Sequence, residues 1–260
     1  MLTAGNRRLI TGVTDNQLLD MPTDPASIAA IFDDPRISPP FLRSSGDILL
    51  LGVVHDHPAS VARVRTLIEA LEPDVLALEL PPVAVPLYRS YAVESSQPPR
   101  FGGEMSQAIA ATNGAQVVGI DGPNRTFVTR LFRRLVAERV PLQTVKRLLG
   151  SVARASREAL TCRLAATVCG VTSLTIIAET PIEYSCSVAD SPERQAEHER
   201  AHVAAVQTLL AESDRQTVRY RDETREACMI DRLESLREDG SVVAVVGMHH
   251  LDALEAGLSG

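Results

Sequence analysis

Two stretches far apart in the chain share one pattern, an apolar run that ends in Gly-x-x-His. The first is Leu49 to His55 and the second is Val242 to His250. Uninterrupted apolar runs with β-branched members predict strands that are covered on both faces, as in a parallel sheet. Each strand would carry an imidazole at its exit, so the pattern constrains both the fold class and the position of a site.

Strands and helices alternate along the chain, which predicts an α/β fold with a mainly parallel central sheet flanked by helices. Apolar residues at helical spacing over 61–71 separate a first strand at 47–54 from a second at 75–80. A strand–helix–strand unit of this length has parallel strands. Further strands are predicted at 116–120 and 242–246.

The ends of the chain differ in character. Residues 1–45 contain five prolines and no clear period, so we interpret them as a loosely ordered N-terminal extension. Residues 46–260 are predicted to form a single α/β domain. Within it, the basic helical stretch 125–157 is expected to place its arginines on a solvated face.

Composition narrows the function class. The net charge of −7 argues against a nucleic-acid surface. There is no secretory signal and no C-x-x-C pair among four cysteines, which favours reduced thiols in a cytoplasmic protein. The longest uncharged run, 164–178, is shorter than the ~20 residues that span a bilayer. We therefore predict no membrane span in this chain, and leave open a peripheral membrane location and a homodimer.

Polar side chains follow all four predicted strands. Ligands of open α/β sheets bind at the edge formed by the carboxyl ends of the strands. A carboxylate inside an apolar strand, as Glu79 is, is costly unless it is paired or bound to metal. Two imidazoles with one or two carboxylates suit Zn, Mn, Co or Fe. The sequence thus predicts a ligand or metal site built from His55, Glu79, Asp121 and His250.

Structural roles for the same residues stay open at this point. Glu79 could be the buried partner of an arginine such as Arg130 or Arg225, and His55 could cap the helix that follows it. The sequence lacks G-x-S-x-G, G-x-x-x-x-G-K and G-x-G-x-x-G, so a serine-hydrolase elbow, a phosphate loop and a dinucleotide cradle are unsupported.

A competing metal motif lies at 198–202, which reads His-Glu-Arg-Ala-His. In the zincin pattern H-E-x-x-H, two imidazoles one helical turn apart bind zinc and the glutamate activates water. Glu223 or Glu226 could supply a third ligand. The flanking residues are charged, whereas zincin helices are apolar around the motif, so we interpret the segment as an exposed helix.

Ordered blocks of the sequence resemble the TraB/PrgY/GumN family, which is related to the Tiki metalloproteases. The blocks follow the family's order over about residues 46–260. They are 51–55, 73–80, 103–105, 114–121 with Thr126 and Arg130, 225–229, and 246–250. The chain departs from the family in having Gly122 where arginine is frequent, and Glu226 where Asp or Asn is usual.

The resemblance implies a fold like that of the erythromycin-esterase and ChaN-type proteins. Tiki relatives are metal-dependent peptidases that use manganese or cobalt, PrgY relatives limit peptide pheromone activity, and ChaN-type relatives bind haem. Transferred by motif, His55, Glu79 and His250 form the core of the site. The supporting candidates are Glu104, Asp121, Arg130 and Arg225.

We therefore predict a metal-dependent hydrolase, of peptidase type, in which His55, Glu79 and His250 bind Mn, Co or Zn and its water. The ion would lower the pKa of that water toward ~7. Arg130 or Arg225 would orient the carboxylates or the developing oxyanion. One alternative is an esterase-like enzyme with His55 as general base and no metal. Another is a non-enzymatic protein that binds a peptide, a pheromone or haem in the same cleft.

Overall fold

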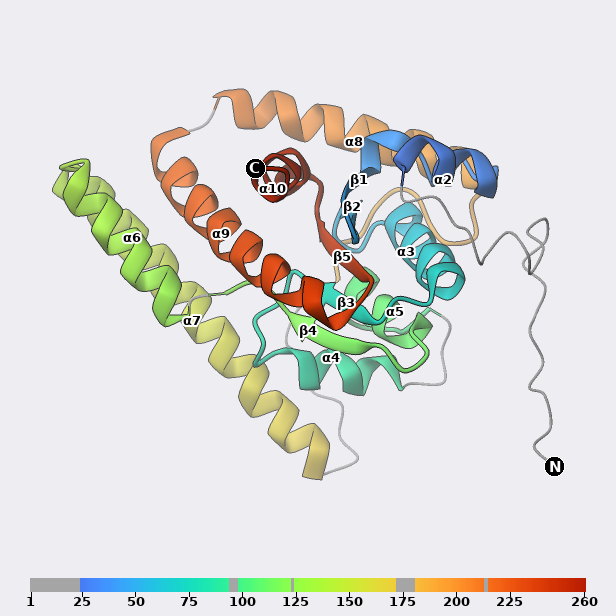
Figure 1. The fold of residues 1–260 in the computed structure, drawn as a ribbon, viewed down its shortest axis with the longest axis horizontal. Coiled ribbons are helices and arrows are strands. Elements are labelled where there is room, and N and C mark those ends of the chain that lie inside the picture. Colours follow the sequence, from blue (N-terminus) through green and yellow to red (C-terminus); the bar gives the residue numbers. More distant parts are fainter. Residues whose placement is uncertain (1–23, 94–97, 123, 172–180, 213–214) are drawn as a thin grey trace.

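The computed structural model describes residues 24–93, 98–122, 124–171, 181–212 and 215–260. Its centre is a five-stranded sheet in the order β1-β2-β5-β3-β4 (Figure 1). Four strands are parallel and one edge strand is antiparallel. The predicted α/β class is confirmed. The strands are β1 (Leu42–Ser45), β2 (Ile48–Val53), β3 (Val75–Leu78), β4 (Gln116–Gly119) and β5 (Val242–Gly247).

Helices cover both faces of this sheet. In chain order they are α2 (Pro25–Phe32), α3 (Pro58–Leu71), α4 (Val85–Ala92), α5 (Gly103–Ala111), α6 (Arg125–Ala137), α7 (Leu142–Val171), α8 (Pro192–Glu212), α9 (Arg215–Leu236) and α10 (Leu251–Leu258). Among the described residues, no helix is both long enough and apolar enough to cross a membrane.

Alternate residues of each central strand enter two separate cores, which explains why the strands are apolar throughout. Leu49 and Leu51 of β2 pack with residues of α3, α4 and α5. Ile48 and Leu50 point to the other face and pack with residues of α9 and α10. Because both faces are covered, polar residues are excluded from the strands until their carboxyl ends.

Residues 24–45 belong to the fold, so their interpretation as a loosely ordered extension is wrong. Ile28, Ile37 and Leu42 are at most 2% exposed and lie in the main core. Strand β1 pairs with β2 from Leu42 to Ser45. Residues 1–23, the remainder of that extension, lie outside the described part of the chain.

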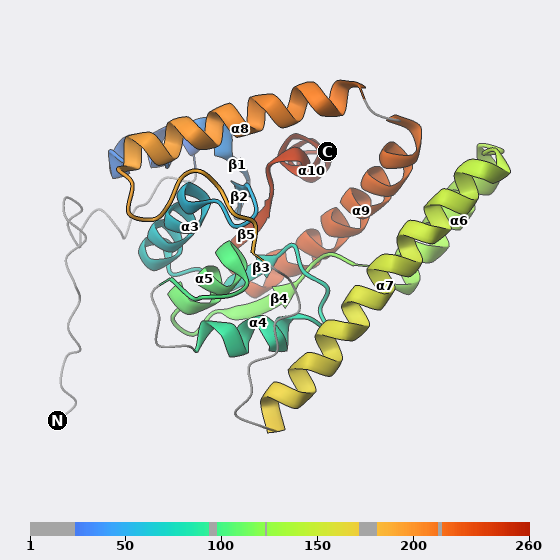
Figure 2. The ribbon, with the colours of Figure 1, turned by 180° about the vertical axis from the view of Figure 1, so that it is seen from behind.

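Helices α6 and α7 form an antiparallel hairpin on one side of the molecule (Figures 1 and 2). A small third core joins the hairpin to α9. It contains Phe127, Leu131 and Leu135 of α6, Leu148 of α7 and Tyr220 of α9. The inner side of the hairpin is therefore packed, and its opposite side faces outward.

Alanine substitutions at two glycines, Gly119 and Gly150, should change the free energy of unfolding in opposite directions. A Cβ on Gly119 would lie 2.6 Å from the carbonyl oxygen of Leu80 and 2.8 Å from the nitrogen of Pro82, so the backbone has to move. We expect Gly119→Ala to lower the free energy of unfolding by about 1–3 kcal/mol. A Cβ on Gly150, within α7, meets no atom within 4 Å, and Gly150→Ala should stabilise by about 0.5–1 kcal/mol. Urea unfolding of both variants measures the two effects, and equal stabilities would contradict the close approach at Gly119.

Candidate functional site

The strand order places the two Gly-x-x-His motifs side by side. In the parallel pairing of β2 with β5, Gly52 lies opposite Val246 and Val53 opposite Gly247. Strand β3 lies on the other side of β5, so Glu79 leaves the sheet at the same edge. Asp121 follows β4 one strand further along. The strand order thus brings the four strand-exit residues to one edge of the sheet, as predicted.

Arg225, from α9, links two of these carboxylates. Its Nη2 donates to Glu79 Oε1 at 2.7 Å and to Asp121 Oδ2 at 2.9 Å, and its Nε donates to Asp121 Oδ1 at 3.1 Å. The backbone N–H of Gly247 donates to the other oxygen of Glu79 at 2.5 Å. Glu79 is thus the buried partner of an arginine, one of the roles left open by the sequence, and it also binds the glycine of the second motif.

The charges of this network shift the pKa values of its members. Burial alone would raise the pKa of Glu79, but His250, Arg225 and the Gly247 amide together lower it well below the usual range. Burial opposes the charge of Arg225, yet Asp121 and Glu79 raise its pKa above the ordinary arginine value. Both groups therefore stay ionised at every physiological pH.

A glutamate carboxylate lies within hydrogen-bonding distance of Nδ1 in each motif histidine. His55 Nδ1 lies 2.7 Å from Glu104 Oε1, and the other oxygen of Glu104 accepts the Asp56 N–H at 2.8 Å. His250 Nδ1 lies 2.8 Å from Glu226 Oε1. Because Nδ1 is bound in both rings, Nε2 is the atom left to meet a ligand.

The His55 and His250 side chains differ in solvent exposure. The His55 side chain is 52% exposed, whereas His250 is fully buried. His250 Nε2 makes no hydrogen bond with the residues that the structure describes, although Glu79 Oε1 lies 3.5 Å away. Glu79 is therefore the ionic partner of His250 when the ring is protonated, and Nε2 lacks only the short, well-aligned hydrogen bond that would satisfy it fully.

Both imidazoles are protonated at neutral pH in this setting. The hydrogen bond to Glu104 raises the pKa of His55 to about 9, against the effect of burial. Burial lowers the pKa of His250, but Glu226 and Glu79 outweigh it and raise that pKa to about 9. Burial and the charge of His250 lower the pKa of neighbouring His249.

Neutralising Glu104 should weaken His55 as a base. In metal-free Glu104→Gln, we expect the pKa of His55 to fall from about 9 toward the ordinary 6.5, because the amide cannot stabilise the imidazolium as a carboxylate does. Proton-detected NMR titration of the His55 ring measures this change. Exposed Glu183→Gln is the matched control and should leave the pKa unchanged. A pKa near 9 in Glu104→Gln would show that another group is responsible.

A cavity of about 1030 Å³ opens in front of this site. Its inner end contains His55, Glu79, Glu104, Asp121 and Arg225, and its wall includes one side of α7. Arg147 and Arg154, two of the arginines predicted to lie on a solvated face, are exposed and also line this cavity. The remaining α7 residues in the wall include Ser151, Ala155, Glu158 and Cys162.

Arg130 does not belong to the site, contrary to the prediction. Its Nη2 donates to Asp231 at 2.6 Å and its Nη1 to the carbonyl of Ala227 at 2.8 Å. Both partners lie on the part of α9 that packs against α6, so Arg130 joins these two helices. Arg225 alone fills the role that the sequence offered to either arginine.

The glutamate of the H-E-x-x-H segment lies in the protein interior and forms a buried ion pair. Glu199 is fully buried and accepts two hydrogen bonds of 2.9 Å from fully buried Arg63, and Ser60 donates to it as well. The interpretation of this segment as an exposed helix is therefore wrong at Glu199, whose side faces α3. A glutamate tied to a buried guanidinium is not free to activate water, which removes the basis of the zincin interpretation.

His57, rather than His55, caps helix α3. Its Nδ1 accepts the Ala59 N–H at 3.2 Å, so its Nε2 carries the proton and donates to His198 Nδ1 at 2.9 Å. Burial lowers the pKa of His57 to about 4. His57 thus acts as a neutral link between α3 and α8.

Sequence reasoning missed the segment that covers the site from 181 to 190. Tyr184 donates its hydroxyl to the carbonyl of His55 at 2.7 Å, and the Ile182 N–H donates to Asp56 at 3.0 Å. The Tyr184 ring also contacts the edges of His57 and His198. No periodicity in this loop indicates these contacts, and His55, Asp56 and His57 lie more than a hundred positions away in the sequence.

A scan against protein-family models, a search of curated proteins and a search of solved structures each found no match. The resemblance to TraB/PrgY/GumN therefore stays a prediction, and the site has to be interpreted from its own geometry.

Proposed function

We propose that this protein is a hydrolase of peptides or small acyl compounds, in which His55, Glu79 and His250 bind a divalent transition metal such as Mn, Co or Zn. The observation that carries the proposal is the pair of imidazoles whose Nδ1 atoms are fixed by Glu104 and Glu226. A metal-binding histidine usually donates its other ring N–H to a carboxylate or another hydrogen-bond acceptor.

The donor chemistry of the site fits such an ion. The two imidazoles have pKa values of about 9, so a dication would bind there by displacing their protons. The groups hydrogen-bonded around them are four carboxylates and one guanidinium. These groups are Glu79, Glu104, Asp121, Glu226 and Arg225. Among the described residues no three His, Cys, Asp or Glu side chains already surround one point. Glu79 Oε1 is held by Arg225 in this arrangement, so binding an ion requires that contact to loosen.

Each residue of the site would have a separate role in the reaction. When bound, the ion would supply a water of lowered pKa and polarise the scissile carbonyl. His55, whose Nδ1 is held by Glu104, would present the ion to a substrate in the cavity. Arg225 fixes Glu79 and Asp121 in position, and its charge lies near any oxyanion that develops beside them. His250, which is buried, would act only as a ligand.

Metal titration followed by thermal unfolding tests the proposal without knowledge of the substrate. An ion that binds only the folded protein raises its apparent stability. We expect Mn, Co or Zn to raise the Tm of the native chain, and His55→Ala and His250→Ala each to abolish the increase. His202→Ala, in the H-E-x-x-H segment, is the control and should keep it. An increase that survives both site variants, or that His202→Ala removes, would contradict the assigned ligands.

A second candidate uses the same cavity without a metal. The His55–Glu104 pair has the arrangement of an esterase-like proton-transfer pair, with a buried carboxylate and an exposed ring. Hydrolysis that persists undiminished after chelation, yet is lost in His55→Ala, would favour this candidate. A Soret band on adding haem that His55→Ala removes would instead favour the binding protein.

A further inference from the structure

The α6–α7 hairpin carries a charge opposite to that of the protein as a whole. Residues 125–171 contain ten arginines and lysines and two glutamates, a net charge of +8, in a chain whose net charge is −7. Arg130 and Arg134 pair with acidic residues of α9. Other basic residues, including Arg133 of α6 and Lys146 and Arg157 of α7, are exposed.

The outward side of the same hairpin is apolar. On α6, Val128, Phe132 and Val136 recur every four residues and are 49–67% exposed. On α7, exposed leucines form a matching stripe that runs the length of the helix. They are Leu142, Leu149, Leu160 and Leu164, and each is at least 55% exposed. We call these seven residues the outer stripe.

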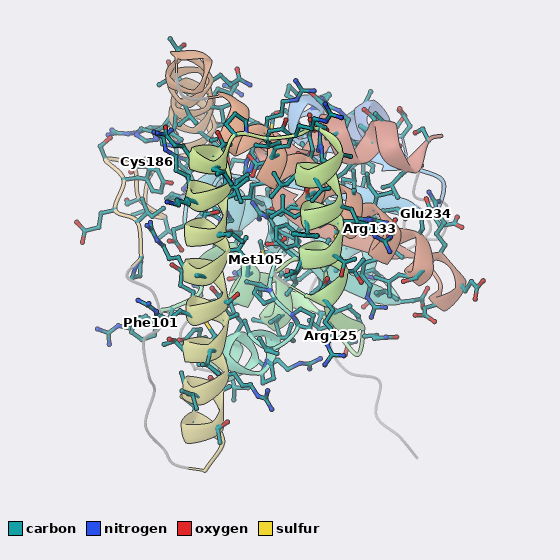
Figure 3. All side chains as sticks on the ribbon, turned by 90° about the vertical axis from the view of Figure 1, so that its left-hand side faces the viewer. Phe101, Met105, Arg125, Arg133, Cys186 and Glu234 are labelled. Carbon is teal, nitrogen blue, oxygen red and sulfur yellow. The ribbon has the colours of Figure 1, made fainter. Side chains whose placement is uncertain are left out.

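Helical geometry separates the outer stripe from the packed side of the hairpin, because on α6 each stripe residue follows a buried residue by one position, about 100° around the helix. On α7, buried Leu148 and Cys162 lie about 100–160° around the helix from Leu149 and Leu160, at 100° per residue. Lys146, Arg157 and Arg163 fall beside the leucines, within about a quarter turn. Figure 3 looks onto the α6–α7 hairpin, whose two helices lie next to each other in front of the rest of the molecule.

We propose that the outer stripe docks the protein on the surface of an anionic lipid bilayer. An interfacial helix needs an apolar side that enters the boundary between headgroups and acyl chains, flanked by Lys and Arg that reach lipid phosphates. Helix α7, with 30 residues, is about 45 Å long and supplies both features along its length. The hairpin lies flat on the bilayer, with the sheet above it.

The charge distribution decides between possible occupants. A second copy that packed its own outer stripe on this one would bring Lys146, Arg157 and Arg163 of both copies together, and these charges repel. A nucleic acid would meet the arginines but would leave the exposed leucines and Phe132 without a partner. An anionic bilayer satisfies both the charges and the apolar side chains.

Vesicle co-sedimentation of the full chain tests this proposal. We expect binding to vesicles of phosphatidylcholine with phosphatidylserine, weakening as salt is added, and no binding to phosphatidylcholine alone. The triple variant Lys146→Glu, Arg157→Glu, Arg163→Glu should bind roughly 100-fold more weakly, since each basic residue near such a surface contributes about fivefold. Leu149→Ser with Leu160→Ser should lose about tenfold or more, because less apolar surface is buried.

Three exposed arginines outside the hairpin give a matched control. The triple variant Arg89→Glu, Arg200→Glu, Arg232→Glu makes the same change in net charge on other helices and should bind vesicles like the native chain. Circular dichroism and thermal unfolding establish that each variant is folded. All the substituted side chains are exposed, so the folds should persist.

Several results would overturn the docking surface. Failure to bind anionic vesicles would do so, as would equal losses in the control and hairpin charge variants. Binding that is insensitive to the leucine substitutions, together with tight binding of an oligonucleotide, would assign the surface to nucleic acid. A stable dimer in light scattering that the leucine substitutions dissociate would assign it to a second copy.

Discussion

Glu199→Ala is expected to lower the free energy of unfolding by about 3–5 kcal/mol, because it leaves the charge of Arg63 buried without its partner. Both side chains are fully buried and joined by two hydrogen bonds of 2.9 Å. Arg63 also donates to the carbonyls of Gly52 and Arg36, and its guanidinium lies 4.0 Å from the centre of the Phe41 ring. Carbonyls and an aromatic face help to hold a guanidinium but do not replace a carboxylate.

Urea unfolding of the native chain, Glu199→Ala and Glu197→Ala measures this effect. Glu197 is on the same helix and exposed, so its substitution should change the stability by less than about 0.5 kcal/mol. The comparison also decides the role of the H-E-x-x-H segment. A catalytic glutamate would give a stable but inactive Glu199→Ala, whereas the core ion pair gives an unstable protein. A change of under 1 kcal/mol in Glu199→Ala would contradict the burial of the pair.

Glu79→Gln should have the largest effect on function. It preserves the size of the side chain and removes the charge that faces both His250 Nε2 and Arg225. We expect hydrolysis to fall by about 100-fold or more, in the range lost when a positioned catalytic group is removed. The metal-dependent rise in Tm should be lost as well, because an amide is a poor ligand compared with a carboxylate.

The matched control for Glu79→Gln is Asp231→Asn. Asp231 pairs with Arg130 outside the site, so the same chemical change there should leave both the metal response and hydrolysis intact. Arg225 keeps its two hydrogen bonds to Asp121 in Glu79→Gln, which limits the loss of stability. A folded Glu79→Gln that retains the Tm increase would exclude Glu79 as a metal ligand.

Much of the fold follows from the sequence because the central strands are buried on both faces. A strand with no polar alternation can be located from its apolar run, and a polar residue that ends it marks the sheet edge. Strand β1 was not predicted, since Leu42-Arg43-Ser44-Ser45 lies on the edge and has only one fully buried residue. Its position depends on pairing with β2 rather than on its own composition.

Pairings across the site were harder to predict than the site itself. His55 and Glu104 could both be named from sequence motifs, but their contact depends on how α5 packs beside β2. Arg130 was included through the family resemblance, and the structure turns it to Asp231 because α6 packs on the outer part of α9. Arg63 and Glu199 are 136 residues apart, and nothing local indicates that they meet.

The position of β5 has a consequence for how the chain reaches this structure during synthesis. Strand β5 is the last in sequence of the five described strands, yet it lies between β2 and β3. Until residues 242–247 emerge, β1–β2 and β3–β4 are two separate ribbons, each with an open apolar edge and no pairing to the other. Such edges invite association between nascent chains. The growing chain should therefore depend on chaperones until β5 pairs with both ribbons.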